Sequence, residues 1–205
     1  MLTIHTHAKQ KRLTSIITTI IGLLILVVGL YILSITLAPA AIPLIPSHKI
    51  DTATLPKPQK TDNRIIIPAI GVNIHYAPGA AALDAGAQWR QPSHGNPANG
   101  GNFVIAAHRL SIQPTPWATI EKSPFYNIDK LAVNDAILVD YIGKRYTYII
   151  KRIFNVTPDQ VEIENISDHP QLTLYSCDLT GAATGRIVII AEPKGSPART
   201  SQFTQ

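Results

Sequence analysis

Residues 13 to 46 contain no charged side chain, and no other feature limits the possible folds of this chain as strongly. Residues 16 to 38 are dominated by Ile, Leu and Val, and a helix of this length can cross a bilayer core of roughly 30 Å. A cleaved signal peptide has a shorter apolar region of about 7–15 residues, although Ala-Pro-Ala-Ala at 38–41 resembles a cleavage site. We therefore expect an uncleaved transmembrane helix over residues 13–38, in contact with membrane lipid.

The charged residues around this helix predict its orientation. Lys9, Lys11 and Arg12 precede it, and the first 47 residues contain no acid. The positive-inside rule then leaves residues 1–12 as a basic cytoplasmic tail and exports the rest. We expect a single-pass cell-membrane protein with an extracellular domain. That remainder holds 15 basic and 13 acidic side chains, too balanced for a nucleic-acid footprint.

Beyond the helix, the chain divides by composition. Residues 39–62 contain five prolines and predict an extended stalk. Residues 63–194 hold short β-branched and aromatic runs separated by turn residues, which predicts an all-β barrel or sandwich with short helices near 80–85 and 116–120. Residues 195–205 predict a disordered tail. The expected strands are 64–67, 102–107, 136–141, 144–153, 171–176 and 186–191, with a hairpin turn at Gly143.

Three reactive side chains stand at ends of these runs. Cys177, the only cysteine, ends one run and excludes an internal disulfide. Arg186 opens the next run after a loop of small residues, and His108 follows an earlier one. A thiolate is a nucleophile, an imidazole can exchange protons with amines, and a guanidinium can hold an oxyanion. These residue types predict a site for acyl transfer through a thiol.

The same residues carry a resemblance to the sortase family. Thr-Leu-Tyr-Ser-Cys at 173–177, followed by Arg186, is similar to the family's Thr-Leu-x-x-Cys…Arg signature. Phe-Val-Ile-Ala-Ala-His at 103–108 resembles its histidine strand, and residues 65–70 its opening strand. Leu-Ala-Val-Asn-Asp at 131–135 resembles its Leu-x-x-Gly-Asp turn. The motifs stand in family order and cover most of residues 63–192.

The resemblance implies an eight-stranded β-barrel and a cysteine transpeptidase. It assigns Cys177 as nucleophile, His108 as general acid and base, and Arg186 as substrate and oxyanion stabiliser. Thr173, Tyr175 and Ser176, within the signature, are expected to bind substrate. The expected partners are surface proteins bearing a Leu-Pro-x-Thr-Gly-like sorting signal and an amine acceptor, either a cell-wall precursor or a pilin lysine.

Two departures from the family pattern concern residues beside the chemistry. Ala107 stands where many relatives have glycine before the histidine, and Asn134 replaces the glycine of the Gly-Asp turn. Residues 39–62 lack the Asp-Pro-aromatic lid of some pilin sortases. That absence favours a housekeeping role over pilus assembly.

The remaining candidates have plainer interpretations. We expect Arg109 to be a solvated loop charge, His94 to lie in a surface turn, and Trp89 and Trp117 to pack in the core or a groove. The acidic region 156–170 is expected to line the substrate groove. Calcium binding there stays open. No other cofactor and no structural zinc is expected, because no residues show metal-ligand spacing.

Two alternative functions stay open. A membrane-tethered β-barrel could bind a peptide without cutting it, and it would not need Cys177. A thiol hydrolase would share the site and release its product to water instead of an amine.

Overall fold

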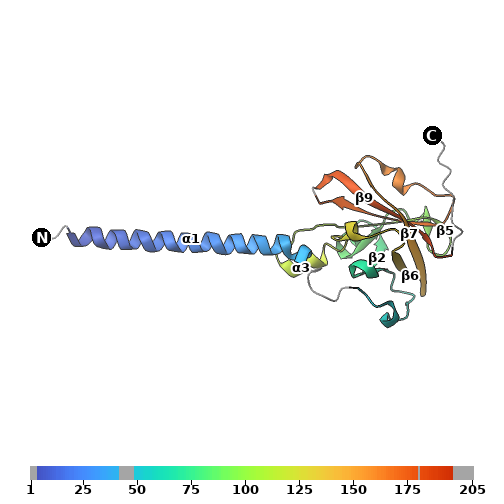
Figure 1. The fold of residues 1–205 in the computed structure, drawn as a ribbon, viewed down its shortest axis with the longest axis horizontal. Helices are drawn as coiled ribbons and strands as arrows, with labels where there is room; N and C mark the ends of the chain where they lie inside the picture. The colour runs from blue at the N-terminus through green and yellow to red at the C-terminus, as the bar shows by residue number, and fades with distance from the viewer. Residues whose placement is uncertain (1–3, 42–48, 180, 196–205) are drawn as a thin grey trace.

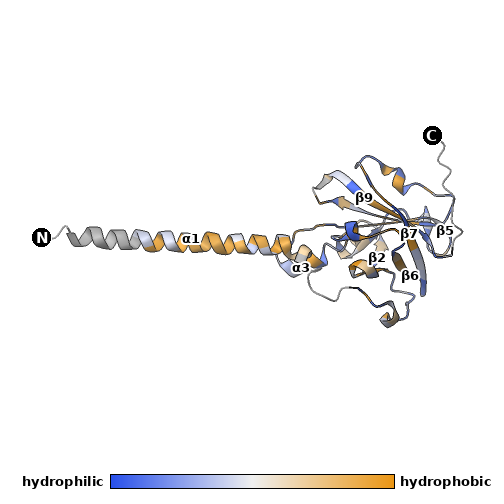
Figure 2. Cartoon of the chain, in the orientation of Figure 1, coloured by the Kyte–Doolittle hydropathy of each residue, from blue (hydrophilic) through white to orange (hydrophobic). Residues whose placement is uncertain are grey.

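The computed structural model describes residues 4–41, 49–179 and 181–195, which form one long helix and one β-barrel domain (Figure 1). Helix α1 (Ile4–Ala41) projects from one end of the domain and begins and ends outside the expected span of 13–38. Its apolar stretch is evident in Figure 2, and the side chains from Thr14 to Ser34 are exposed. Among the described helices it is the one long and apolar enough to cross a membrane, over Thr14–Ala38. This fits a single-pass membrane anchor.

Eight strands close into a barrel. The ring order is β3-β2-β1-β6-β7-β9-β8-β5, and β5 pairs back to β3. The pairs β2–β3 and β5–β8 are parallel, whereas the others are antiparallel. The expected all-β, eight-stranded barrel is thus confirmed. The strands are β1 (Arg64–Ile67), β2 (Val72–Pro78), β3 (Ala87–Trp89), β5 (Gly100–Ala107), β6 (Ala136–Tyr141), β7 (Lys144–Val156), β8 (Gln171–Asp178) and β9 (Gly181–Pro193), with β4 (Gly95–Asn96) paired to β5 outside the ring.

The helices of the domain are all short. The two α-helices, α2 (Ala81–Ala85) and α3 (Pro116–Glu121), lie where they were expected. Thr115 caps α3, because its hydroxyl accepts a hydrogen bond from the amide of Ala118 at 3.2 Å. In the part of the domain that the structure describes there are also four 3₁₀ helices, η2 (Thr52–Thr54), η3 (Pro68–Ile70), η4 (Ile128–Lys130) and η5 (Val161–Glu164).

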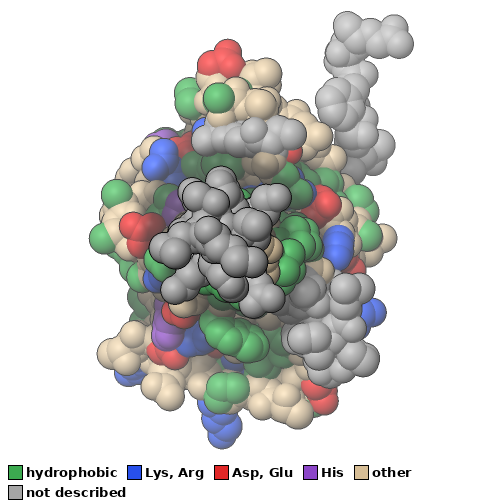
Figure 3. All heavy atoms as spheres, turned by 90° about the vertical axis from the view of Figure 1, so that its left-hand side faces the viewer, with side chains coloured by type: hydrophobic (Ala, Val, Ile, Leu, Met, Phe, Trp, Pro, Cys, Tyr) green, Lys and Arg blue, Asp and Glu red, His purple; other side chains and the backbone are tan. Residues whose placement is uncertain are grey.

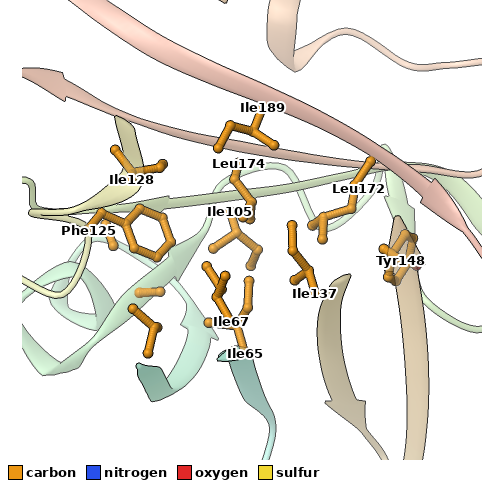
Figure 4. Close-up of a cluster of buried hydrophobic side chains, with 14 of the residues drawn as sticks. Ile65, Ile67, Ile105, Phe125, Ile128, Ile137, Tyr148, Leu172, Leu174 and Ile189 are labelled. Carbon is orange, nitrogen blue, oxygen red and sulfur yellow. The ribbon is translucent and has the colours of Figure 1, made fainter. Parts of the chain in front are cut away.

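The barrel is filled by alternate side chains from its strands, as the two-residue period of a strand requires. Figure 4 shows this cluster, in which Phe125 and Ile128 add to residues from the strands. Trp89 packs edge-on against Phe103 with ring centroids 5.4 Å apart, as expected. Trp117 is 79% exposed, so its expected packing role was wrong. The strand residues labelled in the figure are Ile65, Ile67, Ile105, Ile137, Tyr148, Leu172, Leu174 and Ile189.

Two turns explain local sequence choices. Asn134, which stands where the family has glycine, has a φ of 78°. Asparagine is among the few non-glycine residues that adopt this left-handed region at little cost. The hairpin between β6 and β7 turns through Ile142 and Gly143, with φ values of 47° and 77°. The hairpin was expected, but the β-branched residue in a left-handed conformation was not.

The second half of the expected stalk lies against the barrel. The amide of Ile50 donates to the carbonyl of Pro68 at 3.2 Å, and Arg145 donates to the carbonyl of Pro56 at 2.9 Å. Residues 42–48 and 196–205 fall outside the described residues, so the first half of the stalk and nearly all of the expected tail are not described.

Candidate active site

The β-sheet register brings the three reactive residues to neighbouring strands. Cys177 on β8 lies directly opposite Arg186 on β9. Strands β5 and β8 run parallel, and their ladder ends with Ala106 opposite Tyr175. His108 immediately follows β5, so the same register extended by two residues places it beside Cys177. The residues expected to act together therefore meet at one rim of the barrel.

Hydrogen bonds hold this rim in register. The buried hydroxyl of Ser176 donates to the carbonyl of Ala107 at 2.7 Å, joining the residues just before Cys177 and His108. The carbonyl of His108 accepts from the amide of Phe125 at 3.0 Å. Because Phe125 is fully buried, the core fixes the backbone that carries the imidazole.

The site lies on the outer face of the barrel wall. Leu172 and Leu174 belong to the core, so the alternating residues Thr173, Tyr175 and Cys177 point to the opposite face. Directly opposite residues in an antiparallel pair share a face, which places Arg186 on the outer face too. A substrate lying on this face meets the thiol and the guanidinium together.

The reactive side chains are partly exposed. Cys177 is half-buried, and the side chain of His108 is 29% exposed. The Nε2 of His108 lies 3.3 Å from Oδ1 of Asp84 on α2, whose side chain is 82% exposed. This carboxylate can orient the imidazole ring. Asp84 was missed from the sequence because α2 lies 24 residues before the histidine and carries no motif.

Arg109 is not the solvated charge that was expected. Its side chain is 8% exposed and lies 3.1 Å from Asp129 and 4.0 Å from Asp178. Residue 109 follows the histidine and residue 178 follows the cysteine. The buried guanidinium of Arg109 therefore links the chain segment that carries His108 to the segment that carries Cys177.

A second polar cluster fixes the β7–β8 loop, residues 157–170, against the barrel. Its centre is Glu164, which accepts hydrogen bonds from Arg90 Nε at 2.9 Å, from Gln91 Nε2 at 3.1 Å and from the Tyr175 hydroxyl. The Nδ1 of His94 lies 2.6 Å from the Glu164 carbonyl. His94 therefore belongs to this cluster and is more than a residue of a surface turn.

The electrostatics of Glu164 follow from these contacts. Burial raises the pKa of its carboxyl, but hydrogen bonds from Tyr175, Arg90 and Gln91 outweigh burial and leave the pKa below its ordinary value. Burial, together with the carboxylate of Glu164, raises the pKa of Tyr175. The loop is thus held by an ionised carboxylate and a neutral phenol.

Three residues were expected to bind substrate, and all three have protein partners. The buried Thr173 hydroxyl donates to Asn102 Oδ1 at 2.6 Å, and Asn102 donates in turn to the carbonyls of Ile163 and Asn165. Tyr175 donates to Glu164, and Ser176 donates to the β5 backbone. Substrate contact by these residues stays a prediction, and the bonds give them a positioning role.

A cavity of about 500 Å³ lies beneath the β7–β8 loop. It is lined by Asn102, Gln171 and Ile190 and by residues of the loop, but by none of the three reactive residues. The cavity therefore lies on the same outer face of the barrel but at a distance from the thiol of Cys177. In the described part of the chain, no group of three or more His, Cys, Asp or Glu residues is arranged to hold a metal ion.

Comparison with known proteins agrees with this fold. The sortase domain model matches residues 65–194, whereas no curated protein sequence matches the chain. A Clostridium perfringens sortase D5 transpeptidase is 27% identical, with a TM-score of 0.54 over 65% of this chain and 79% of that one.

Two further solved structures are similar in fold. Sortase A of Listeria monocytogenes is 20% identical, with a TM-score of 0.52 over 64% of this chain and 86% of its own. Sortase A of Corynebacterium diphtheriae is also 20% identical, with a TM-score of 0.54 over 72% and 66%. The family domain covers more than half of the chain and contains the three reactive residues, so this protein belongs to the sortase family, which implies a cysteine transpeptidase type of activity.

Proposed function

We propose that this protein cleaves a sorting signal of the Leu-Pro-x-Thr-Gly type and transfers the resulting acyl fragment to an amine. The observation that carries the proposal is the direct cross-strand pairing of Cys177 with Arg186, with His108 just beyond the end of the adjoining parallel strand β5. The family relationship supports the reaction class, and the three residues supply its chemistry.

The reaction proceeds in two acyl transfers. The thiolate of Cys177 attacks the carbonyl carbon of the peptide bond between Thr and Gly, forming a tetrahedral oxyanion beside Arg186. The carbon–nitrogen bond breaks, the departing amine takes a proton from His108, and a thioester remains. An acceptor amine then attacks the thioester, gives a proton to His108 and releases the cysteine. The acceptor first to be tested is a cell-wall precursor amine, followed by a pilin lysine.

Helix α1 would hold the enzyme at the cell membrane. Its apolar stretch has the length for one crossing, and Lys9, Lys11 and Arg12 favour a cytoplasmic N-terminus. The barrel then lies on the outer side of the membrane, where sorting-signal proteins and cell-wall precursors meet.

The test uses the purified full-length protein in detergent with Leu-Pro-x-Thr-Gly-like peptides and a glycine or lysine amine. Mass spectrometry identifies the products. We expect a peptide ligated at Thr to the amine, no product from Cys177→Ala or His108→Ala, and a large loss of turnover in Arg186→Lys. Arg152→Lys is the matched control, because Arg152 is an exposed arginine on the neighbouring strand β7.

The products distinguish the alternatives. Cleavage without ligation, at any amine concentration, would identify a thiol hydrolase. Peptide binding that survives Cys177→Ala, without any product from the unaltered protein, would identify a binding module and overturn all three catalytic assignments.

A further inference from the structure

The face of the domain beside α1 has its polar and apolar side chains reversed. This face comprises the β5–α3 segment, residues 109–115, and helix α3. Leu110, Ile112 and Trp117 are 36%, 55% and 79% exposed, whereas Thr119 and Ser123 are buried at 0% and 4%. A surface in water normally shows the opposite arrangement.

Hydrogen bonds maintain this reversal. The hydroxyl of Thr119 accepts from the Gln113 amide at 2.9 Å, and the hydroxyl of Ser123 accepts from the Ser111 amide at 3.0 Å. These bonds hold the backbone amides of Ser111 and Gln113 against buried hydroxyls. The neighbouring side chains of Leu110 and Ile112 are left exposed to the outside. The apolar exposure is thus built into the backbone of the segment.

The same face contacts α1 well before the helix ends. The Tyr31 hydroxyl donates to the carbonyl of Pro114, and α3 packs against α1. Figure 3, which views the molecule along α1, shows hydrophobic side chains beside the helix on this face. The β5–α3 segment therefore lies at the level of Tyr31, inside the apolar stretch Thr14–Ala38.

The length of α1 sets the depth of this face in a membrane. At roughly 1.5 Å per residue, the helix from Thr14 to Tyr31 is about 27 Å long. That nearly fills a hydrocarbon core of roughly 30 Å. Tyr31 then lies at the outer interface, where tyrosine and tryptophan are enriched, and the rest of α1 continues beyond it to Ala41.

We infer that Leu110, Ile112 and Trp117 form a docking face that rests in the lipid interface of the membrane crossed by α1. The lipid is the occupant because the apolar helix emerges from the same face, and because Tyr31 of that helix contacts Pro114, three residues before the exposed Trp117. The inference rests on the proposed membrane crossing but is independent of the proposed catalysis. Since the β5–α3 segment directly follows His108, docking holds the catalytic rim close to the membrane surface.

The chain has two tryptophans, and one of them reports on this face. The full-length protein is reconstituted in phosphatidylcholine–phosphatidylglycerol vesicles whose acyl chains are brominated, and tryptophan fluorescence is measured. We expect the brominated lipid to quench a fraction of the emission, and we expect that fraction to be lost in Trp117→Phe. The remaining emission comes from Trp89, which is buried in the barrel.

A pair of matched variants tests the face itself. Ile112→Asp should reduce the quenching of Trp117 by brominated lipid. Ile142→Asp should leave it unchanged, because Ile142 is also 55% exposed but lies in the β6–β7 turn.

Each contrary result has a distinct meaning. If alkaline carbonate leaves the protein in the vesicles but Trp117 is quenched only by aqueous acrylamide, the crossing stands and the docking face is wrong. If Trp117 is shielded from both quenchers, a second copy of the chain covers the face, which also overturns lipid docking. Release by carbonate overturns crossing and docking together, while transpeptidation in detergent would still test the catalytic proposal separately.

Discussion

Two segments flank the catalytic rim, and they are fixed by different physical means. The β7–β8 loop depends on one carboxylate, Glu164, which collects hydrogen bonds from Arg90, Gln91 and Tyr175. The β5–α3 segment, beyond the ion pairs of Arg109, depends on separate neutral hydroxyls, each of which accepts a hydrogen bond from one backbone amide. The first arrangement concentrates its hydrogen bonds on one ionisable group, whereas the hydroxyl bonds of the second are separate and involve groups that do not titrate.

The difference matters because both segments connect directly to the catalytic strands. Tyr175 lies two residues before Cys177, and residue 109 directly follows His108. A change at Glu164 should therefore act on the outer face around the cysteine. A change at Thr119 or Ser123 should act on the histidine side and on the face beside α1.

The largest expected effect comes from removing the central carboxylate. Glu164→Leu should lower the free energy of unfolding by about 2–3 kcal/mol, because a charged acceptor is lost while the partly buried Tyr175 and Gln91 lose their partner. Urea unfolding in detergent measures the change. Glu162→Leu is the control, because Glu162 is an exposed acid of the same helix η5. Equal effects for the two variants would show that the cluster does not stabilise the loop.

The hydroxyls of the β5–α3 segment should each contribute less. Thr119→Val keeps the shape of a fully buried side chain but leaves the Gln113 amide without its acceptor, so we expect a loss of about 1–2 kcal/mol. Thr61→Val, at an exposed threonine, should change the stability little. If Thr119→Val lowered the free energy of unfolding as much as Glu164→Leu does, the two segments would not differ in how strongly they depend on a single side chain.

The contributions of the two segments to the free energy of unfolding should also differ in their dependence on pH. The pKa of Glu164 is lowered in the folded protein, so its contribution is complete above the ordinary carboxyl pKa and is lost as the pH falls through the lower folded value. The difference in unfolding free energy between the unaltered protein and Glu164→Gln should therefore be constant above about pH 5 and shrink in more acidic solution. The corresponding difference for Thr119→Val should not depend on pH. A constant Glu164→Gln difference down to strong acid would contradict the role of the ionised carboxylate.

The smallest expected effect is a gain in stability at a turn that belongs to neither segment. Ile142 has a φ of 47° and precedes Gly143 in the β6–β7 hairpin. Ile142→Asn creates the Asn-Gly pair that this kind of turn prefers, and it should raise the free energy of unfolding by about 0.5–1 kcal/mol. Val133→Asn is the control, because Val133 is 51% exposed and lies outside the set of positive-φ residues. A destabilised Ile142→Asn would mean that apolar contacts of the isoleucine outweigh its backbone strain.

The sequence predicted those strands that form a continuous apolar run between turn residues. Strands β1 and β6 have the expected bounds, because their apolar runs end at clear turn residues. Strand β2 was missed although Val72, Ile74 and Tyr76 alternate with polar residues as in a half-buried strand, because the prediction relied on continuous apolar runs. Strand β3 was missed because three residues are too few to show a period. The loop expected between Cys177 and Arg186 is mostly strand, because β9 begins at Gly181 and the ladder is only irregular after Cys177.

The candidate site was predictable as far as its motifs extend. Motif spacing identified the three reactive residues, and the register explains how they meet. The residues that support them were not identified, because Arg90 and Glu164 are 74 positions apart and only the closed barrel joins them. Arg109 was misjudged for the same reason, since its acidic partners Asp129 and Asp178 come from helix η4 and the end of strand β8, which are distant in sequence.

The position of β9 in the chain has a consequence for the timing of activity. This strand lies between β7 and β8 in the ring and carries Arg186, so the wall that supports the cysteine is incomplete until residues 181–193 have been made. A nascent or truncated chain that ends before Gly181 contains the thiol and the imidazole but lacks both the arginine and the neighbour of β8. If the proposed function is correct, such a chain can be held by α1 before it can transfer an acyl group, and membrane insertion then precedes the first turnover.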